Sequence, residues 1–322
     1  MSPFYDAFAI SQQTCFSLIL KIYPLTYQLI VLKAMQIISN PLELRTLLEP
    51  WRRQGEKIAF VPTMGHLHAG HLKLVEEAAR VAQHVVVSIF VNPLQFGPHE
   101  DYQTYPRTLQ TDSEKLRSVG TEILWTPKVE DLYPQTLENC TRVEVPHVST
   151  ILCGASRPGH FTGVTTIVNK LLNIVQPHKA FFGEKDYQQL LIIRRMVNEL
   201  FIPVQINSVP TVREADGLAM SSRNSYLSPQ ERIIAPYLFE VINSIRERIQ
   251  SGQQHFIALE SQAIFNLAQA GFEPHYVAIR CAETLEIPSS TIKHLVILAA
   301  ARLGKARLID NVQLNLESSD HS

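Results

Sequence analysis

Two histidines separated by two residues are the first side chains in this 322-residue sequence whose types and spacing could do chemistry. His68 and His71 belong to the tetrapeptide His-Ala-Gly-His, which follows an apolar run at 58–61 and begins a segment with helical spacing. The first turn of a helix has unpaired N–H groups and a positive dipole end, so it binds anions, most often phosphate. Two imidazoles add donors, and Gly70 lets a nucleotide approach the backbone. We therefore predict a nucleotide site here, rather than a turn with two incidental, solvated histidines.

Later polar residues suit the binding of a phosphate and a small acid. Asn92 and Gln95 follow a second apolar run, and amides such as theirs and that of Gln189 can bind hydroxyl and carboxylate groups. Lys185 and Arg223 would bring fixed positive charge to a phosphate. Each has an ordinary alternative: Asn92 as a turn cap, Gln189 on a solvated helix face, and the two cations as surface charges. In the same way, a histidine at 160 could order its own loop instead of touching a substrate.

A parallel sheet is needed to bring these residues together. Five apolar runs predict buried strands, at 58–61, 84–91, 122–126, 179–182 and 204–212. Helical spacing between them is typical of a Rossmann-like, doubly wound α/β fold, in which ligands bind beyond the carboxyl ends of the strands. We therefore expect His68, His71, Asn92 and Gln95 to lie along one edge of the sheet.

Capping signals predict where several helices begin. Asn40 before Pro41 marks one start, Thr111 with Glu114 suggests a capping box, and Ser228 before Pro229 opens a long helix. A further helix is expected from about 165 to 175.

The pattern changes after a polar break at 214–217. A helix around 258–270 is followed by strands around 275–279, 295–301 and 307–308. We therefore predict a Rossmann-like domain at 35–211, a smaller α+β domain at 212–318, and a tail at 319–322.

The first 34 residues do not match the rest of the chain. Their apolar stretch at 15–32 is interrupted by Lys21 and Pro24, and a central lysine is costly in a membrane span. No clear basic start or small-residue cleavage site indicates a secretory signal. We expect the functional chain to begin near Met35, with the leader at 1–34 outside the fold. Intact-mass measurement of protein made from its native locus tests this, and a membrane-bound species starting at Met1 would contradict it.

The composition narrows the function and the compartment. The net charge of −1 argues against a nucleic-acid-binding protein, which usually carries a basic surplus. Four cysteines, at 15, 140, 153 and 281, form no C-x-x-C pair, so neither a disulfide framework nor a zinc site is expected. A reducing cytoplasm, with neither nucleic acid nor membrane as a partner, is the simplest prediction.

Taken together, six ordered motifs resemble the pantothenate synthetase (pantoate–β-alanine ligase) family, in the H-x-G-H nucleotidyltransferase-like superfamily. They lie at 62–71, 91–96, 157–161, 183–186, 188–189 and 221–224. The resemblance runs from about residue 35 to 316 and leaves the leader without a counterpart.

The resemblance implies a two-step ligase reaction in the biosynthesis of pantothenate and coenzyme A. Pantoate and ATP, with magnesium, would give pantoyl adenylate and pyrophosphate, and β-alanine would then displace AMP. The resemblance also implies a homodimer that acts on small molecules in the cytoplasm. It leaves the magnesium ligands and the dimer interface open.

It also implies roles for individual residues. The ATP-binding residues would be Met64, Gly65, His66, Leu67, His68, Ala69, Gly70, His71, Gly183, Glu184, Lys185, Asp186, Val212, Met220, Ser221, Ser222 and Arg223. His71 would be the proton donor, and His68, Lys185 and Arg223 would assist catalysis. Gln95 and Gln189 would hold pantoate, and we add Asn92 as a substrate-binding candidate. The family usually has leucine at the place of Met220, a swap of similar volume from which little effect is expected.

Two other functions compete with this hypothesis. A simple nucleotidyltransferase would transfer AMP to a phosphate, but Gln95 and Gln189 suit an uncharged or carboxylate acceptor better. An RNA-binding module is disfavoured by the near-zero net charge. An AMP assay distinguishes the nucleotidyltransferase from the ligase, because the ligase forms AMP only when β-alanine is added to pantoate and ATP. Weak RNA binding with no salt dependence would exclude the RNA-binding module.

Overall fold

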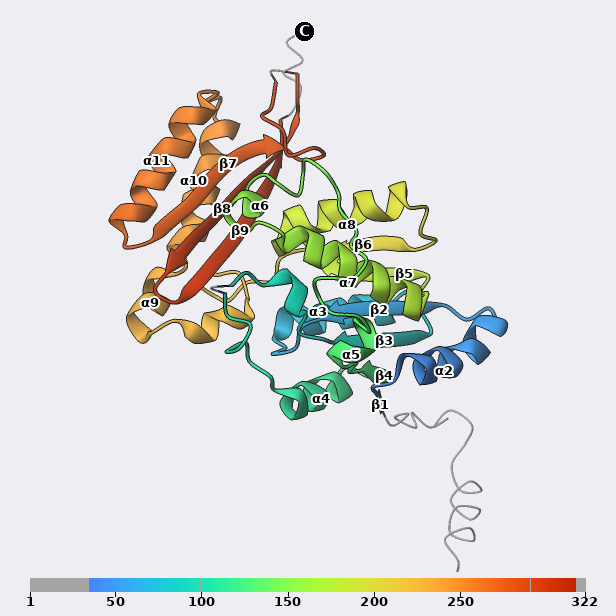
Figure 1. Ribbon diagram of the computed structural model, residues 1–322. Helices are drawn as coiled ribbons and strands as arrows, with labels where there is room; N and C mark the ends of the chain where they lie inside the picture. Colours follow the sequence, from blue (N-terminus) through green and yellow to red (C-terminus); the bar gives the residue numbers. More distant parts are fainter. Residues whose placement is uncertain (1–34, 99, 290, 317–322) are drawn as a thin grey trace, which may run out of the picture. The chain divides into compact units, whose positions relative to one another are not determined.

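The computed structural model describes residues 35–98, 100–289 and 291–316 (Figure 1). The leader expected at 1–34 and the tail expected at 319–322 therefore lie outside the described residues. Within the described ranges, no helix has the length and apolar character that a membrane crossing requires. Two sheets organise these residues.

Six parallel strands form the larger sheet, in the order β1-β4-β3-β2-β5-β6. They are β1 (Gln36–Ile38), β2 (Ile58–Thr63), β3 (His84–Ile89), β4 (Ile123–Trp125), β5 (Lys179–Gly183) and β6 (Gln205–Val209). All five predicted runs form strands, which confirms the doubly wound α/β expectation. Sequence patterning missed β1, because three residues are too few to show a period. β6 ends before Pro210, which has no N–H to give to a neighbouring strand.

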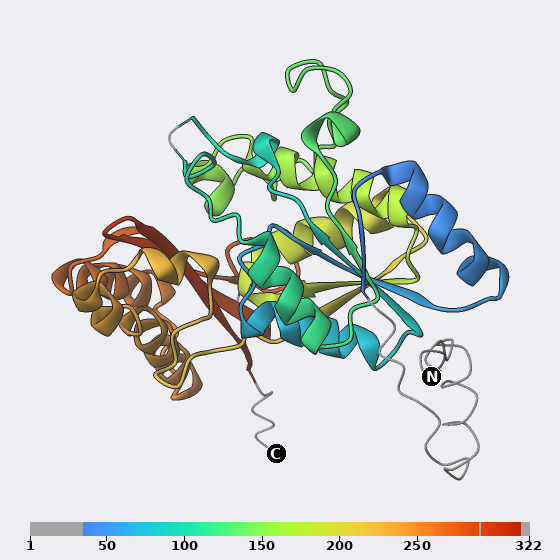
Figure 2. The ribbon, with the colours of Figure 1, turned by 90° about the horizontal axis from the view of Figure 1, so that it is seen from below.

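Helices cover both faces of this sheet (Figure 2). One face carries α2 (Pro41–Arg53), α7 (His160–Val175) and α8 (Tyr187–Glu199), and the other carries α3 (Ala69–Ala79) and α4 (Leu109–Ser118). Short α5 (Val129–Leu132) and α6 (Cys153–Ser156) lie in connections, as do η1 (Pro93–Gln95), η2 (Glu184–Asp186) and η3 (Ser222–Tyr226). Alternate residues of β2 serve the two cores: Phe60 packs on the first face and Val61 on the second. The continuous apolar run of this strand follows from burial on both faces.

The smaller sheet is antiparallel and follows in the chain (Figure 1). It contains β7 (Glu273–Cys281), β8 (His294–Leu303) and β9 (Ala306–Asn315), after α9 (Pro229–Ile234), α10 (Tyr237–Gln250) and α11 (Phe256–Gln269). Leu295 and Ile297 face the core shared with α10 and α11, whereas Val296 and Leu298 join the core of the larger sheet. The expected α+β character of this part is confirmed, and β8 joins it to the first sheet by packing.

Three helix boundaries differ from the predictions. The asparagine cap of α2 is confirmed, because Asn40 Oδ1 accepts the N–H of Leu42 at 2.8 Å. The capping box at Thr111 and Glu114 is wrong, since α4 already begins at Leu109. The box of Ser228 with Glu231 does form, yet the helix it starts ends at Ile234 and a new one follows Pro236. Finally, α7 begins at His160 instead of near 165, after the positive-φ residue Gly159.

Candidate active site

A cavity of about 220 Å³ gathers most of the predicted site residues at the carboxyl ends of the parallel strands. The predicted residues that line it are Met64, His68, Gly70, His71, Asn92, Gln95, Gly183, Lys185, Asp186, Gln189, Val212, Met220, Ser221, Ser222 and Arg223. The expectation that the histidines share one edge with Asn92 and Gln95 is thus confirmed. Gly65, His66, Leu67, Ala69 and Glu184 are not part of the cavity wall.

The two imidazoles cap α3 reciprocally and are thereby fixed in orientation. His68 Nδ1 accepts the N–H of Gly70 at 3.2 Å, and His71 Nδ1 accepts the N–H of His68 at 3.3 Å. Since both Nδ1 atoms accept, each neutral ring carries its proton on Nε2. A Cβ at residue 70 would lie 2.9 Å from the His68 ring, which explains the glycine between the histidines.

Both imidazoles are neutral at physiological pH. Burial, with His71 and Lys185 nearby, lowers the pKa of His68 to about 2. Burial, again with Lys185, lowers the pKa of His71 to about 4. Desolvation and nearby positive charge both disfavour an imidazolium. The pair therefore offers uncharged Nε2–H donors to an anion in the cavity.

The turn before these histidines is held by α4. Asp112 is fully buried, and its carboxylate accepts the N–H groups of His66 and Leu67, both at 2.8 Å. Lys115 Nζ donates to the Leu67 carbonyl at 2.6 Å. His66 and Leu67 therefore contribute through their backbone to the shape of the turn. Sequence reasoning missed Asp112, because only the folded structure brings the first turn of α4 to this loop.

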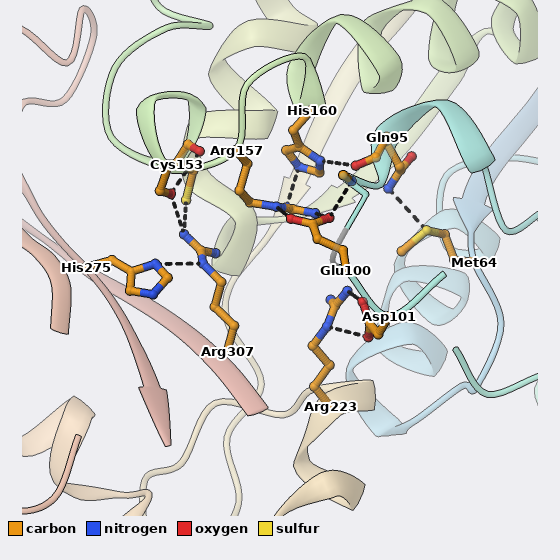
Figure 3. Close-up of polar contacts among 12 residues, drawn as sticks. Met64, Gln95, Glu100, Asp101, Cys153, Arg157, His160, Arg223, His275 and Arg307 are labelled. Atoms are coloured by element: carbon orange, nitrogen blue, oxygen red, sulfur yellow. Dashed lines mark hydrogen bonds and ion pairs between the residues drawn. The ribbon is translucent and has the colours of Figure 1, made fainter. Parts of the chain in front are cut away.

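Gln95 is positioned by a buried network behind the cavity wall. Asn92 Nδ2 donates to Gln95 Oε1 at 3.0 Å and to the Gly163 carbonyl at 3.1 Å. Asn92 Oδ1 accepts from Tyr133 Oη at 2.7 Å. With 1% exposure and these partners, Asn92 acts as a support for Gln95. Gln95 Nε2 in turn lies 3.2 Å from Met64 Sδ (Figure 3).

A second support comes from the Arg-Pro-Gly-His loop (Figure 3). His160 Nδ1 donates to the Gln95 carbonyl at 2.8 Å, and its Nε2 accepts from Arg157 Nη1 at 2.8 Å. Arg157 also forms an ion pair with Glu100. Burial lowers the pKa of His160 to about 3, so the ring is neutral. These contacts favour the interpretation that His160 orders its loop.

The two predicted cations differ in their partners. Lys185 lines the cavity and forms no ion pair within the described ranges. Its turn is anchored from β9, because Asn311 Nδ2 donates to the carbonyls of Glu184 and Lys185 at 2.8 and 3.0 Å. Arg223 instead binds Asp101 through two hydrogen bonds of 3.0 and 2.8 Å. Both cations are thus built into the cavity region rather than scattered on the surface.

Sequence reasoning also missed the apolar part of the wall. Four residues of α7 line the cavity, namely Val164, Ile167, Val168 and Leu171. Their helical spacing was the only signal, and it is equally typical of a core-facing helix. Tyr105, from the loop before α4, is another wall residue that was not expected.

This fold and cavity define a Rossmann-like class of enzyme with an H-x-G-H turn in the cavity wall. The model of the family described as pantoate-beta-alanine ligase matches residues 36–313. The chain belongs to this family of amide-forming ligases.

Individual relatives agree with this assignment. A pantothenate synthetase of Nitrosococcus oceani is 54% identical over 286 residues, which are 89% of this chain and 100% of that protein. The crystal structure of pantothenate synthetase from Thermus thermophilus is similar, with a TM-score of 0.81, 46% identity and coverage of 86% of this chain and 99% of that one. A pantoate–β-alanine ligase from Francisella tularensis, complexed with β-γ ATP and β-alanine, has a TM-score of 0.74, 36% identity and coverage of 87% and 97%.

Proposed function

We propose that this chain condenses pantoate with β-alanine at the expense of ATP, forming pantothenate through pantoyl adenylate. The observation that carries the proposal is the single cavity shared by two neutral imidazole donors, Lys185 and two glutamines. Family membership supports the overall reaction. AMP and pyrophosphate are the other products.

In the first step, an oxygen of the pantoate carboxylate attacks the α-phosphorus of ATP. The bond to the β-phosphate oxygen breaks, and pyrophosphate leaves with the electron pair. Such phosphoryl-centred steps depend on positioning and on donors aimed at the developing charge. We assign Nε2–H of His68 and His71 to the phosphate oxygens, with Lys185 and Arg223 offsetting charge.

The acid is held on the opposite side of the reacting centre. We assign Gln95 and Gln189 to the hydroxyl and carboxylate groups of pantoate, since amides both donate and accept. Asn92 holds the side-chain amide of Gln95 in place from behind, and His160 holds the main-chain carbonyl of the same residue. A fixed orientation brings the carboxylate close to the phosphorus and lowers the entropic part of the barrier.

In the second step, the amine of β-alanine attacks the acyl carbon, and the bond to the AMP oxygen breaks. The nitrogen gives up a proton to water as the amide forms, and AMP leaves with the electron pair as a phosphate monoester anion that stays mostly unprotonated at neutral pH. His71 then acts as a hydrogen-bond donor to the leaving phosphate, which gives the implied "proton donor" a specific meaning. Exclusion of water protects the acyl adenylate, and we propose Ser221, Ser222 and Arg223 as part of that closure.

The residues of the chain fit a magnesium ion that is held mainly by ATP. In the described part of the chain, no three His, Cys, Asp or Glu side chains could hold a metal by themselves. Asp186 lines the cavity, and its carboxylate has no ion pair there among described residues. Mg²⁺ commonly takes one or two carboxylates with phosphates and water. We infer Asp186 as its protein ligand, and the bound ion would neutralise phosphate charge.

We further propose a homodimer in the cytoplasm, with the chain divided at 211/212 into nucleotide-binding and smaller domains. Three free cysteines in the described ranges, at 140, 153 and 281, are consistent with a reducing compartment. The change from a parallel to an antiparallel sheet supports the division. Sedimentation velocity measures the oligomeric state.

An assay of AMP and pyrophosphate tests the proposed function. With ATP and pantoate alone, the enzyme should form bound adenylate and pyrophosphate, and AMP should appear only after β-alanine is added. Transfer of AMP to a phosphate acceptor in the absence of β-alanine would favour the simple nucleotidyltransferase instead.

A further inference from the structure

A second, larger cavity adjoins the phosphate end of the candidate active site. It measures about 610 Å³ and shares four lining residues with the first cavity, which are Lys185, Asp186, Ser221 and Arg223. None of the predicted site residues beyond these four lines it. We call this cavity the basic groove, and Figure 3 shows the arginines at 157, 223 and 307 around it.

The far wall of the basic groove is the hairpin between β8 and β9. Arg302, Lys305 and Arg307 of this hairpin line the groove. Arg302 and Arg307 are direct cross-strand partners in the antiparallel register. Like charges placed opposite each other on a sheet are destabilising, so an anion between them would relieve a cost that the fold carries.

The groove has an excess of positive charge that the chain does not neutralise. Arg157 pairs with Glu100 and Arg223 with Asp101, and both acids also line the groove. Lys185, Arg302, Lys305 and Arg307 have no carboxylate partner in the described part of the chain. Among the described residues that line the groove, Asp186 is then the only carboxylate without a cationic partner.

The hydrogen bonds of Arg307 leave its charge uncompensated. Its guanidinium donates to Cys153 Sγ at 3.3 Å, Ser156 Oγ at 3.4 Å and His275 Nδ1 at 3.4 Å, all uncharged acceptors (Figure 3). Burial, together with Arg307 and Arg302, lowers the pKa of His275. Arg307 is therefore oriented by neutral groups and keeps its full charge for a ligand.

We propose that the basic groove binds inorganic pyrophosphate after it leaves the nucleotide cavity, with Arg302 and Lys305 as binding residues. The proposal rests on the proposed function, since adenylation is the step that releases pyrophosphate. In-line displacement sends the leaving group away from the attacking acid. Gln95 and Gln189 line the first cavity and not the groove, whereas Lys185 and Arg223 border both. A compact polyanion suits four converging, unpaired cations.

Direct binding of sodium pyrophosphate to the full chain tests the proposal by isothermal titration calorimetry. Arg302→Gln/Lys305→Gln should raise the Kd for pyrophosphate roughly tenfold, the scale for removing two partly exposed charges. Both residues are exposed, so the fold should persist. The charge-keeping Arg302→Lys/Lys305→Arg should restore most of the affinity.

A charge-matched control is Arg117→Gln/Lys293→Gln, which removes two exposed cations that line none of the described cavities. Lys293 directly precedes β8 and lies nine residues before Arg302, roughly 30 Å away in an extended strand. This control should bind pyrophosphate as the unaltered protein does. Equal loss in both double variants, or sulfate binding as tight as pyrophosphate, would overturn the proposal.

Turnover separates this proposal from the proposed function. If the unaltered chain makes pantothenate but Arg302→Gln/Lys305→Gln leaves inhibition by pyrophosphate unchanged, only the groove assignment fails. If no AMP forms with pantoate and β-alanine, the proposed function fails, and the calorimetry still reports on the groove. The KM values for pantoate and β-alanine should stay unchanged in the hairpin variant.

Discussion

Individual side chains in the cavity are fixed mainly by backbone contacts. His68, His71 and His160 each use one ring nitrogen in a hydrogen bond to the main chain. His68 and His71 therefore each present Nε2 to the cavity, whereas Nε2 of His160 is already bonded to Arg157. The sequence predicted the first two as anion donors, because H-x-G-H at a helix start has a local signature. It left open the role of His160, whose partners come from another part of the chain.

Removing one of these donors should slow adenylation. We expect His71→Ala to lower pantoyl adenylate formation by roughly 10²-fold or more, the scale for losing one transition-state donor. Pantoate-dependent exchange of pyrophosphate into ATP measures the step. His294→Ala, a histidine paired with Glu283 and absent from the cavity wall, is the matched control. Near-normal exchange by His71→Ala would remove this residue from the role.

The amide at residue 95 should govern use of the acid. Gln95→Ala should raise the KM for pantoate roughly tenfold and leave the KM for ATP nearly unchanged, since a hydrogen bond in the acid part is lost. Asn92→Ala should raise the KM for pantoate by a smaller factor, because this change only loosens the side chain of Gln95. Steady-state kinetics checks both, with exposed Gln205→Ala as the control. A defect confined to ATP would contradict this placement.

Buried neutral histidines also make stability depend on pH. The pKa of His160 falls from 6.5 to about 3 on folding, so below pH 6.5 the unfolded chain binds a proton that the folded chain does not. As the pH falls from 6.5 toward the folded-state pKa of about 3, the free energy of unfolding therefore decreases by about 1.4 kcal/mol per pH unit. Urea unfolding measured at several pH values between 3 and 6.5 should show that the free energy of unfolding depends less steeply on pH in His160→Gln. An unchanged dependence on pH would mean that the His160 ring is already protonated in the folded protein.

Among the elements, α4 shows how a helix far from the ligand shapes the site. Its first turn carries Asp112 and its last turn carries Lys115, and together they bind both N–H and C=O groups of the turn before α3. We expected a capping box at Thr111 and Glu114 instead. The short-range signal was misleading because the buried acid of this turn is used by another loop, and local sequence does not report that contact.

Loss of this carboxylate should weaken both the fold and the nucleotide site. Asp112→Ala leaves two N–H groups without acceptors, so we expect the free energy of unfolding to fall by about 2 kcal/mol or more. The KM for ATP should rise, because the turn before His68 loses its shape. Glu114→Ala, an exposed change in the same helix, should do neither. Urea denaturation and steady-state kinetics measure the two effects.

The strands show what local patterns do predict. The predicted runs at 58–61, 84–91, 122–126 and 179–182 each form a buried parallel strand, because burial on both faces leaves a strong signal. The ends of helices and strands were predicted less accurately. Pro236 divides a helix that was expected to continue, and β9 extends well past the predicted strand at 307–308. A proline is a known helix breaker, so the first error had a visible cue.

At the scale of the whole molecule, convergence of distant segments decides the site. Motif order predicted that histidines near residue 70 would meet Lys185 and Arg223, and one cavity contains them all. The contributions of Asn311 and of the β8–β9 hairpin were not predictable, since they depend on how the smaller sheet packs against the larger one. Contacts between sheets leave no periodic trace in a sequence.

Residues 69 and 70 stand next to each other in the H-x-G-H turn but have opposite surroundings. Ala69 is exposed, whereas any Cβ at residue 70 meets the imidazole that caps the helix. A saturation library under selection for growth without added vitamin should accept many amino acids at the first codon and almost none besides glycine at the second. The tolerance of a position is then set by free space around the main chain, even within a single motif of four letters.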